Sequence, residues 1–573
     1  MASLTNQEIA EILNHISQIL DIQGENPFKI RAYVKASQTI ANLTDQLASL
    51  EEKGKIPKLP GIGEGIAKKI SELIQTGKLQ YYEDLKKSEY APLTEFLKIP
   101  GMGPKHAKLV HDKLGIKSVE ALRKAAEKGK LRTLPGLGEK AERNILQGLQ
   151  QVQKYKERFP LAFIYPRAQA ILEEMKKVKE VQQITLAGSL RRMRETIADV
   201  DILVASDHAE KVMDAFVHLP QTVKVVAKGH TKSSIVTKDS IPVDLRVVMS
   251  ESFGAASHYF TGSKAHNIRI RSLGADQGLK INEYGVFKKE KSIAGKTEEE
   301  IFKSVNLPYI PPELREDQGE IEAAQKGKLP CLVEPEHIKG DLHIHTNWSD
   351  GNSSIEEMAQ AAKRRNYHYI AICDHSVSMG IAHGLNQQRL QKQIKAIEEI
   401  NRAFKGFKIL SGLEVDIKPD GELDLDDEIL QRLDIVVAAV HSKFSQSKDE
   451  MTLRIIQAIE NPNVHIIAHP TGRIIGKREP YALDLDKVMD ACRANGKILE
   501  LNAYPERLDL SDIHCRKAKE KGVKLAISTD AHMDRHLDWM KFGLATARRG
   551  WIEPEDVINT LPLSKLLKSL PRR

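Results

Sequence analysis

The sequence predicts a multidomain α/β protein, with a helical N-terminal region, a mixed α/β region and a C-terminal parallel barrel. Three observations indicate this fold class. A Pro-Gly-x-Gly pattern recurs three times before residue 150, helix and strand patterns alternate over residues 151–250, and seven apolar runs alternate with helical stretches after residue 337. At 573 residues the chain is too long for a single core, which favours several domains.

The composition excludes several classes of protein. Hydrophobic residues make up 41% and charged residues 29%, as in ordinary globular proteins. No apolar run has membrane-spanning length and the N-terminus lacks a signal-peptide pattern, so we expect a cytoplasmic protein with no membrane contact. Four dispersed cysteines form no CxxC pair, which argues against a zinc knuckle or a disulfide framework.

The positive charge is concentrated in the N-terminal region. The net charge is +8, and residues 1–160 hold 26 Lys and Arg against 19 Asp and Glu. A localised basic surface is typical of proteins that bind a polyanion, although charge alone is a weak indication.

The three repeats predict hairpins between short helices. They read LPGIGEGIAKKI from Leu59, IPGMGPKHAKLV from Ile99 and LPGLGEKAERNI from Leu134. Glycine allows the tight turn, and N–H groups at the start of the second helix can then hold a phosphate without reading a base. One copy would be explained by a plain turn, but three copies in a basic region favour DNA contact at Gly61, Gly63, Gly101, Gly103, Gly136 and Gly138.

The sequence GSLRRMRETIADVDIL, which begins at Gly188, predicts a nucleotidyl-transfer site. A strand turns into a helix at Gly188 and Ser189, where backbone N–H groups suit a triphosphate. Arg191 and Arg192 add charged donors for phosphate oxygens.

Asp199 and Asp201 follow on one face of the next predicted strand, because side chains alternate along a strand. Two such carboxylates suit a pair of divalent cations, and Asp244 in IPVDLRVV is the candidate for a third. A turn and an exposed strand face would explain either half of the motif alone. The two halves together favour the functional interpretation.

Residues 251–315 contain SHYFTGSKAHNIRIRSLGADQGLKINEYGVF from Ser257, a helix and turn rich in side chains that contact bases and sugars. A Pro-rich, charged stretch follows and indicates a boundary.

Polar side chains follow the apolar runs of the C-terminal region, and the ends of parallel barrel strands gather at one face. They are His343, His345, Asp350, His375, Glu414, His441, His469, Asp530 and His532. A lone histidine is usually a buried structural residue, but nine such groups suit two or three ions of Zn²⁺, Mn²⁺ or Fe²⁺.

Such a cluster suits hydrolysis of a phosphoester. Arg473 is the candidate for holding the substrate phosphate. Glu500 and Asn502 end a strand without a proposed ligand, and we leave open whether they support the ligands or are structural.

Together these motifs resemble the bacterial family X DNA polymerases, in which a polymerase beta-like core precedes a PHP (polymerase and histidinol phosphatase) domain. The resemblance covers essentially the whole chain. It implies helix-hairpin-helix domains, a nucleotidyltransferase palm with an α/β thumb, and a distorted (β/α)7 barrel. The implied limits are 1–85 for a lyase-like DNA-binding domain, 86–150 for the fingers, 151–250 for the palm, 251–315 for the thumb, 316–336 for a linker and 337–573 for the PHP domain.

The resemblance also implies roles in the polymerase core. Asp199, Asp201 and Asp244 would be catalytic and bind two Mg²⁺ or Mn²⁺ ions. The dNTP would contact Gly188, Ser189, Arg192, Tyr259, Phe260, Gly262 and Asn267, and the template strand would contact Arg271. Met193 and Ala198 stand where the polymerase beta pattern has glycines, and Lys264 where it has an aspartate.

For the PHP domain, the resemblance implies up to three Mn²⁺ or Zn²⁺ ions and 3′→5′ removal of nucleotides, with cleavage at abasic sites in some members. One ion would use His343, His345, Glu414 and Asp530, a second Glu414, His441 and His469, and a third Asp350, His375 and His532.

In the N-terminal domain, Lys69 matches a lyase lysine supported by Lys29 and Tyr33, although Gly65 replaces a second active-site lysine. A merely phosphate-facing Lys69 is an equal alternative.

We therefore expect a monomeric gap-filling repair polymerase that takes dNTPs and gapped or nicked DNA, and that also carries a nuclease. Two alternatives remain open. One is a DNA-end-binding nuclease without polymerase activity, and the other is a small-molecule phosphatase joined to a DNA anchor.

Overall fold

The computed structural model describes residues 6–41, 43, 47–52, 56–59, 61–99, 101–154 and 158–570. The chain forms two compact units, residues 1–158 and 159–573. Across the described residues, no helix is both long enough and apolar enough to cross a membrane.

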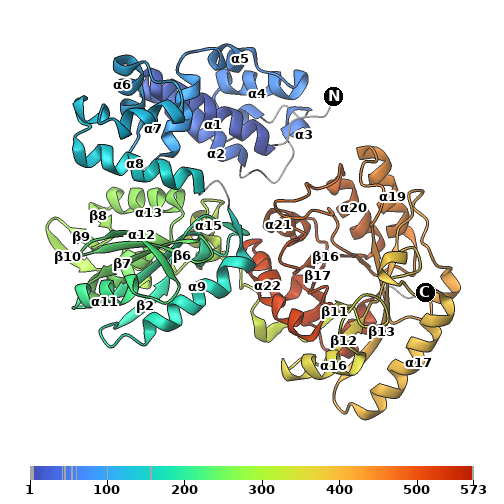
Figure 1. The fold of residues 1–573 in the computed structure, drawn as a ribbon. Coiled ribbons are helices and arrows are strands. Elements are labelled where there is room, and N and C mark those ends of the chain that lie inside the picture. Colours follow the sequence, from blue (N-terminus) through green and yellow to red (C-terminus); the bar gives the residue numbers. More distant parts are fainter. Residues whose placement is uncertain are drawn as a thin grey trace. The chain divides into compact units, whose positions relative to one another are not determined.

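The first unit contains helices and no strand in its described part (Figure 1). Its apolar side chains form two hydrophobic clusters. Its helices are α1 (Asn6–Gln23), α2 (Pro27–Ala41), α3 (Leu47–Glu52), α4 (Glu64–Thr76), α5 (Gln80–Lys86), α6 (Pro104–Leu114), α7 (Val119–Glu127) and α8 (Glu139–Lys154). Helix α8 continues past the predicted limit at residue 150, and its apolar residues Ile145 and Leu149 pack in the second cluster.

The three predicted hairpins share one local geometry. Gly61, Gly101 and Gly136 have φ angles of +79°, +88° and +79°, a conformation that favours glycine. In each copy the next residue donates its N–H to the carbonyl three residues earlier, as Ile62 does to Leu59 at 3.1 Å. Pro60 and Pro100 lie outside the described residues.

The second glycine of each hairpin lies at a helix start. Gly63 and Gly103 directly precede α4 and α6, and a Cβ added at Gly63, Gly103 or Gly138 would meet no atom within 4 Å. The backbone at these helix starts therefore faces open space, as a phosphate contact requires.

The second unit begins with a five-stranded mixed sheet in the order β2-β4-β7-β6-β5. Its strands are β2 (Gln183–Leu186), β4 (Val200–Ala205), β5 (Thr222–Lys228), β6 (Lys232–Thr237) and β7 (Pro242–Val248). Strands β4 and β7 pair in parallel, and apolar side chains from both pack with helices α9 (Leu161–Lys176) and α11 (Ala209–Val217).

A smaller layer follows the mixed sheet. It consists of α12 (Phe253–Thr261), α13 (Lys264–Asp276), the antiparallel strands β8 (Leu279–Asn282), β9 (Gly285–Lys288) and β10 (Lys291–Ala294), α14 (Glu298–Ser304) and α15 (Glu320–Gln325).

A buried ion cluster joins this layer to the mixed sheet. Glu298 accepts hydrogen bonds from Arg191 at 2.6 and 2.8 Å and from Arg315 at 2.7 Å. Arg315 is fully buried and Glu298 is 7% exposed.

We expect Glu298→Gln to destabilise the second unit by about 3 kcal/mol, because it leaves two buried guanidinium groups short of a counter-charge. All three tryptophans, Trp348, Trp539 and Trp551, lie in this unit, so urea unfolding followed by tryptophan fluorescence measures the change. The neighbouring exposed Glu299→Gln is the matched control. Equal stability of the two variants would contradict the prediction.

The C-terminal part of the second unit is a seven-stranded parallel sheet. Its strands are β11 (Gly340–Ile344), β12 (Tyr369–Ile372), β13 (Lys408–Asp416), β14 (Ile435–Ala439), β15 (Ile466–Ile467), β16 (Ile498–Asn502) and β17 (Leu525–Ser528), paired in sequence order. A bridge between Ile344 and Ala531 links the first strand to the segment after the last. The predicted barrel is therefore confirmed in a nearly closed form.

Side chains of the barrel strands alternate between two hydrophobic clusters. Tyr369 and Ala371 pack with Leu566 of helix α23 (Leu563–Ser569), whereas Ile370 and Ile372 pack with the surrounding helices. Those helices are α16 (Ile355–Arg364), α17 (Gln387–Ala403), α18 (Asp427–Leu430), α19 (Lys448–Glu460), α20 (Leu485–Asn495), α21 (Asp512–Glu520) and α22 (Met540–Arg549).

Candidate active sites

The three predicted acidic residues of the mixed sheet lie on neighbouring strands. Asp201 in β4 and Asp244 in β7 are direct partners in the parallel register. Asp199 directly precedes β4 and is exposed. The pairing of two distant segments thus places the third carboxylate beside the Asp-x-Asp motif.

The electrostatics of this acidic cluster suit divalent cations. Burial, and then the nearby carboxylates of Asp199 and Asp244, raise the pKa of Asp201 to about 7. The amine of Lys232 lies 2.5 Å from Asp244 and offsets part of the charge. Cations between the carboxylates would relieve the remaining repulsion, and carboxylate oxygens are the ligands that Mg²⁺ and Mn²⁺ prefer.

Gly188 lies directly against the acidic cluster. Its φ is +62°, and a Cβ at this position would come within 2.4 Å of Asp201 Oδ2, so only glycine fits. The predicted helix start is a single turn, α10 (Gly188–Arg191), followed by Met193 at a φ of +54°. Because so short a helix carries little dipole, the turn geometry rather than a macrodipole orients the N–H groups around Ser189.

The two predicted phosphate-binding arginines are held by carboxylates in this structure. Arg191 forms an ion pair with Glu298 at 2.6 Å, and its expected role in phosphate binding stays a prediction. Arg192 donates to Glu316 at 3.0 Å and to the carbonyl of Thr261 at 2.5 Å. Arg549 of α22 also donates to Glu316, at 3.0 Å. These contacts engage Nε and Nη1 of Arg192, and its contact with a triphosphate stays a prediction.

The predicted nucleotide-contacting segment ends α12. Tyr259 and Phe260 are half-buried, and the guanidinium of Arg246 in β7 lies 4.3 Å from the Phe260 ring centroid. Gly262, with a φ of +74°, follows directly.

The next helix, α13, carries the last two predicted contacts of this region. Asn267 is buried and donates from Nδ2 to the carbonyl of Tyr259 at 2.7 Å, while its Oδ1 has no partner among the described residues. Arg271 is exposed on the same helix.

The nine predicted ligands of the barrel converge at the C-terminal ends of its strands. Three groups have ligand atoms within 4.8 Å of one another: His345, Asp350, His375 and His532; His343, His345 and Asp530; and His375, Glu414 and His441.

This grouping differs from the implied ligand sets. His345 and His375 each belong to two groups, so they lie between neighbouring positions. His469 belongs to no group, although its Nε2 lies 3.1 Å from Glu414 Oε1. The assignment of ligands to individual ions therefore stays a prediction.

Unpaired polar atoms in this cluster fit metal ions. Nε2 of His343 and Nε2 of His345 lie 3.1 Å apart. Nδ1 of the buried His345 has no hydrogen-bond partner among the described residues, and Nε2 of each of these histidines lies 3.6 Å from Glu414 Oε2. Buried polar atoms without partners are costly, and cations among these nitrogen and oxygen atoms would supply the missing partner.

Carboxylates behind the cluster orient its imidazoles, as outer partners do in metal sites. Glu500, which the sequence left open, lies 2.8 Å from His343 Nδ1. Asp416, which sequence reasoning missed, lies 3.2 Å from His441 Nδ1. Asp416 is the last residue of β13, two positions after Glu414. Residues at this spacing share one face of a strand, so the sequence could have indicated that Asp416 lies beside the ligands.

Arg473 does not point freely into the cluster. It donates to the carbonyl of Arg507 at 2.9 Å and to Glu195 Oε2 at 2.8 Å. Arg507 is closer to the ligands, with Nε 4.0 Å from Asp530 Oδ2 and a buried Nη1 that has no partner among the described residues. The role of Arg473 as the phosphate contact stays a prediction, and Arg507 is a second candidate.

The predicted residues of the first unit gather around one ring. Nζ of Lys69 lies 5.0 Å and Nζ of Lys29 lies 5.8 Å from the ring centroid of Tyr81, and Tyr33 is stacked on the same ring at 6.3 Å. Tyr81, which links these side chains, was not among the residues predicted from the sequence.

Acidic residues on a mixed sheet, together with an imidazole–carboxylate cluster at a barrel end, are typical of enzymes that make and break phosphodiester bonds. Family models match four parts of the chain. These are a helix-hairpin-helix domain at residues 4–79, a SAM-like helix-hairpin-helix tandem at 93–151, a DNA polymerase beta thumb at 256–316 and a PHP domain at 341–504.

A relative matches almost the entire chain. The DNA polymerase/3′-5′ exonuclease PolX of Bacillus subtilis (strain 168) is 41% identical over 570 residues, which cover 99% of both chains. A probable phosphatase of Thermoanaerobacter sp. (strain X514) is 35% identical over 38% of this chain and 89% of its own. The chain belongs to the PolX family of family X DNA polymerases with a PHP domain.

Proposed function

We propose that this protein is a DNA polymerase that adds dNTPs to a primer 3′-hydroxyl in short gaps, and that its barrel removes nucleotides in the 3′→5′ direction. The observation that carries the proposal is the register pairing of Asp201 with Asp244 in a chain that matches a polymerase/exonuclease over 99% of its length. Gapped DNA as substrate and a monomeric state are part of the proposal.

In the acidic cluster, Asp199, Asp201 and Asp244 would hold two divalent ions. Bound there, these ions would neutralise charge on the attacking and leaving oxygens. The carboxylate of Asp244 would assist the primer 3′-hydroxyl once Lys232 moves away from it. Arg192 would release Glu316 and donate to the triphosphate, while Arg549 retains Glu316.

In the barrel, the nine ligands would hold up to three Mn²⁺ or Zn²⁺ ions. Such ions activate water and neutralise the phosphate. Glu500 and Asp416 hold the imidazoles of His343 and His441 in orientation, and Arg507 would contact the scissile phosphate.

Primer extension on a gapped duplex with Mg²⁺ and dNTPs tests the first activity, and Mn²⁺-dependent shortening of a 5′-labelled strand tests the second. Absence of extension would favour an end-binding nuclease. Absence of shortening, with hydrolysis of a small phosphate monoester, would favour the phosphatase activity that the Thermoanaerobacter relative's name suggests.

We expect Lys69→Ala to weaken binding of a gap with a 5′-phosphate by about 10-fold, because a charge-assisted contact is lost. Binding of the same gap with a 5′-hydroxyl should be unchanged, and fluorescence anisotropy measures both affinities. Lys68→Ala, on the exposed face of the same helix, is the control. An equal loss for both gaps would contradict a 5′-phosphate contact. Borohydride trapping of an abasic 5′ end would reveal lyase chemistry at Lys69.

A further inference from the structure

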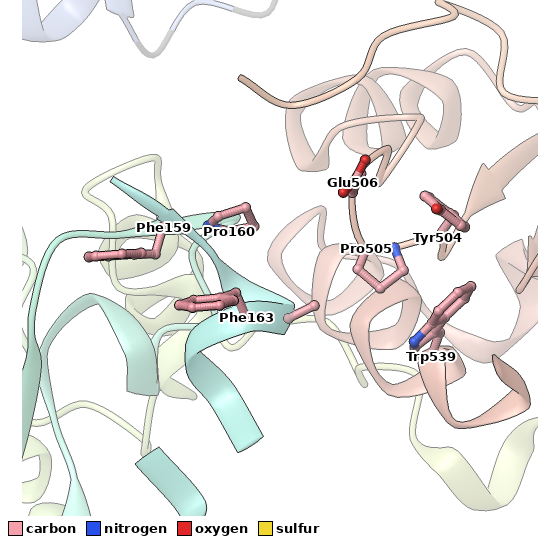
Figure 2. Close-up of a pocket in the computed structure, with 8 residues that line it drawn as sticks. Phe159, Pro160, Phe163, Tyr504, Pro505, Glu506 and Trp539 are labelled. Carbon is pink, nitrogen blue, oxygen red and sulfur yellow. The ribbon is translucent and has the colours of Figure 1, made fainter. Parts of the chain in front are cut away.

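An aromatic cavity of about 390 Å³ lies between the start of the mixed-sheet region and the loop after β16 (Figure 2). Phe159 and Phe163 form one wall, and Tyr504, Pro505 and Trp539 form the other. The acidic cluster of Asp199, Asp201 and Asp244 includes none of these five residues. The nine candidate ligands at the barrel end, called here the barrel cluster, also include none of them.

The first wall is a fixed stack of rings. Phe159 and Phe163 lie 5.6 Å apart between centroids at an interplanar angle of 10°, and the guanidinium of Arg167 lies 3.7 Å from the centroid of Phe163. Phe159, in β1 (Phe159–Pro160), pairs with Ile197 of β3 (Thr196–Ile197). Because Ile197 is two residues before Asp199, this wall continues into the acidic cluster.

The second wall leads to the barrel ligands. Trp539 stacks on His536 at 3.6 Å and contacts Tyr504 edge-on at 4.9 Å. The N–H of His532 donates to His536 at 3.3 Å. Tyr504 donates its N–H to Asn502, which in turn donates to Asp530 at 3.1 Å. One residue therefore separates the Trp539 side chain, and the Tyr504 backbone, from a predicted ligand.

The two walls belong to one packed body. Leu508 and Phe542 of the barrel region are buried in the same hydrophobic cluster as Leu161 and Ile164 of α9. The cavity is therefore built into the fold. Among the described residues, the charged one that lines the cavity is Glu506. It is paired with Lys477 at 2.8 Å, which reduces repulsion of a phosphate backbone.

Half-buried aromatic rings in such a cavity are suited to one kind of DNA ligand. Bases of a single strand stack on aromatic side chains regardless of sequence, whereas paired bases have no free face to offer. A cavity of this volume is in the range of small-ligand sites. We propose that the cavity binds an unpaired base near the 3′ end of the strand whose phosphodiester enters the barrel cluster. This proposal rests on the proposed nuclease function.

Fluorescence of 2-aminopurine tests the stacking without any turnover. The base is placed in turn at each of the last four positions of a single-stranded oligonucleotide, and the full chain is added without divalent metal. We expect quenching at one or two positions, and its loss in Phe159→Ala. The control is Leu453→Ala, an exposed apolar residue on α19 outside the cavity. Absence of quenching at every position, or quenching unchanged in Phe159→Ala, would overturn the proposal.

Hydrolysis supplies a second readout. Phe159→Ala should lower kcat/KM on single-stranded DNA by about 10-fold and leave hydrolysis of bis-p-nitrophenyl phosphate unchanged. With abasic residues at the quenched positions, wild type and variant should react equally. A loss that persists on abasic DNA would overturn base stacking. Quenching without any hydrolysis by wild type would support the cavity and refute the nuclease function.

Discussion

Asp201→Asn should abolish primer extension and leave removal of 3′ nucleotides intact. Asp201 is the central carboxylate of the cluster, paired in register with Asp244 and pressed against Gly188. Asparagine keeps the volume and removes the charge that would hold two cations. Loss of one preorganised electrostatic contact lowers the rate by about 10²–10³-fold. Asp201 would be a ligand of both cations, so its loss should lower the extension rate by about 10³-fold or more.

Single-turnover extension of a gapped primer measures this effect. Asp207→Asn, an exposed aspartate just beyond the same strand, is the matched control and should extend normally. Extension by Asp201→Asn at the wild-type rate would refute the assignment of the acidic cluster. Loss of both activities together would indicate misfolding, which tryptophan fluorescence would reveal.

The fold and the convergence of the candidate ligands were predictable from the sequence. In a parallel sheet, the position of each ligand depends mainly on where it lies relative to the end of its own strand. Glu414 lies near the end of its strand and His375 and His441 lie two or three residues beyond theirs, and parallel strands end at one face. Likewise, Asp-x-Asp and Asp244 need only one strand pairing to meet. Once the strands pair, residues at the strand ends are therefore brought together at one face of the sheet.

The partners of the arginines were not predictable from sequence. Arg191 meets Glu298, Arg192 meets Glu316, and Arg473 meets Glu195, across sequence separations of 107, 124 and 278 residues. A basic residue in a phosphate-binding motif and one in a buried ion pair have the same local sequence. Only tertiary packing decides which carboxylate is within reach.

Glu414→Gln should abolish 3′-nucleotide removal and leave primer extension intact. Glu414 is buried among five imidazoles, with His375 Nδ1 at 2.7 Å, His469 at 3.1 Å, His441 at 3.3 Å, and His343 and His345 at 3.6 Å each. If metal ions bind among these imidazoles, the carboxylate of Glu414 would lie close to more than one of them. Changes to outer partners of metal sites cost about 10–100-fold, so replacing this central group should exceed 100-fold.

Metal content distinguishes a lost ligand from a lost fold. Glu414→Gln should bind fewer equivalents of Mn²⁺ than wild type and keep its extension rate, because the acidic cluster has its own ligands. Glu428→Gln, an exposed glutamate of α18 in the same barrel, should behave as wild type in every assay. Nucleotide removal by Glu414→Gln within a few-fold of wild type would refute the barrel as the nuclease site. Because the two clusters use different strands of one packed unit, each variant serves as the folding control for the other.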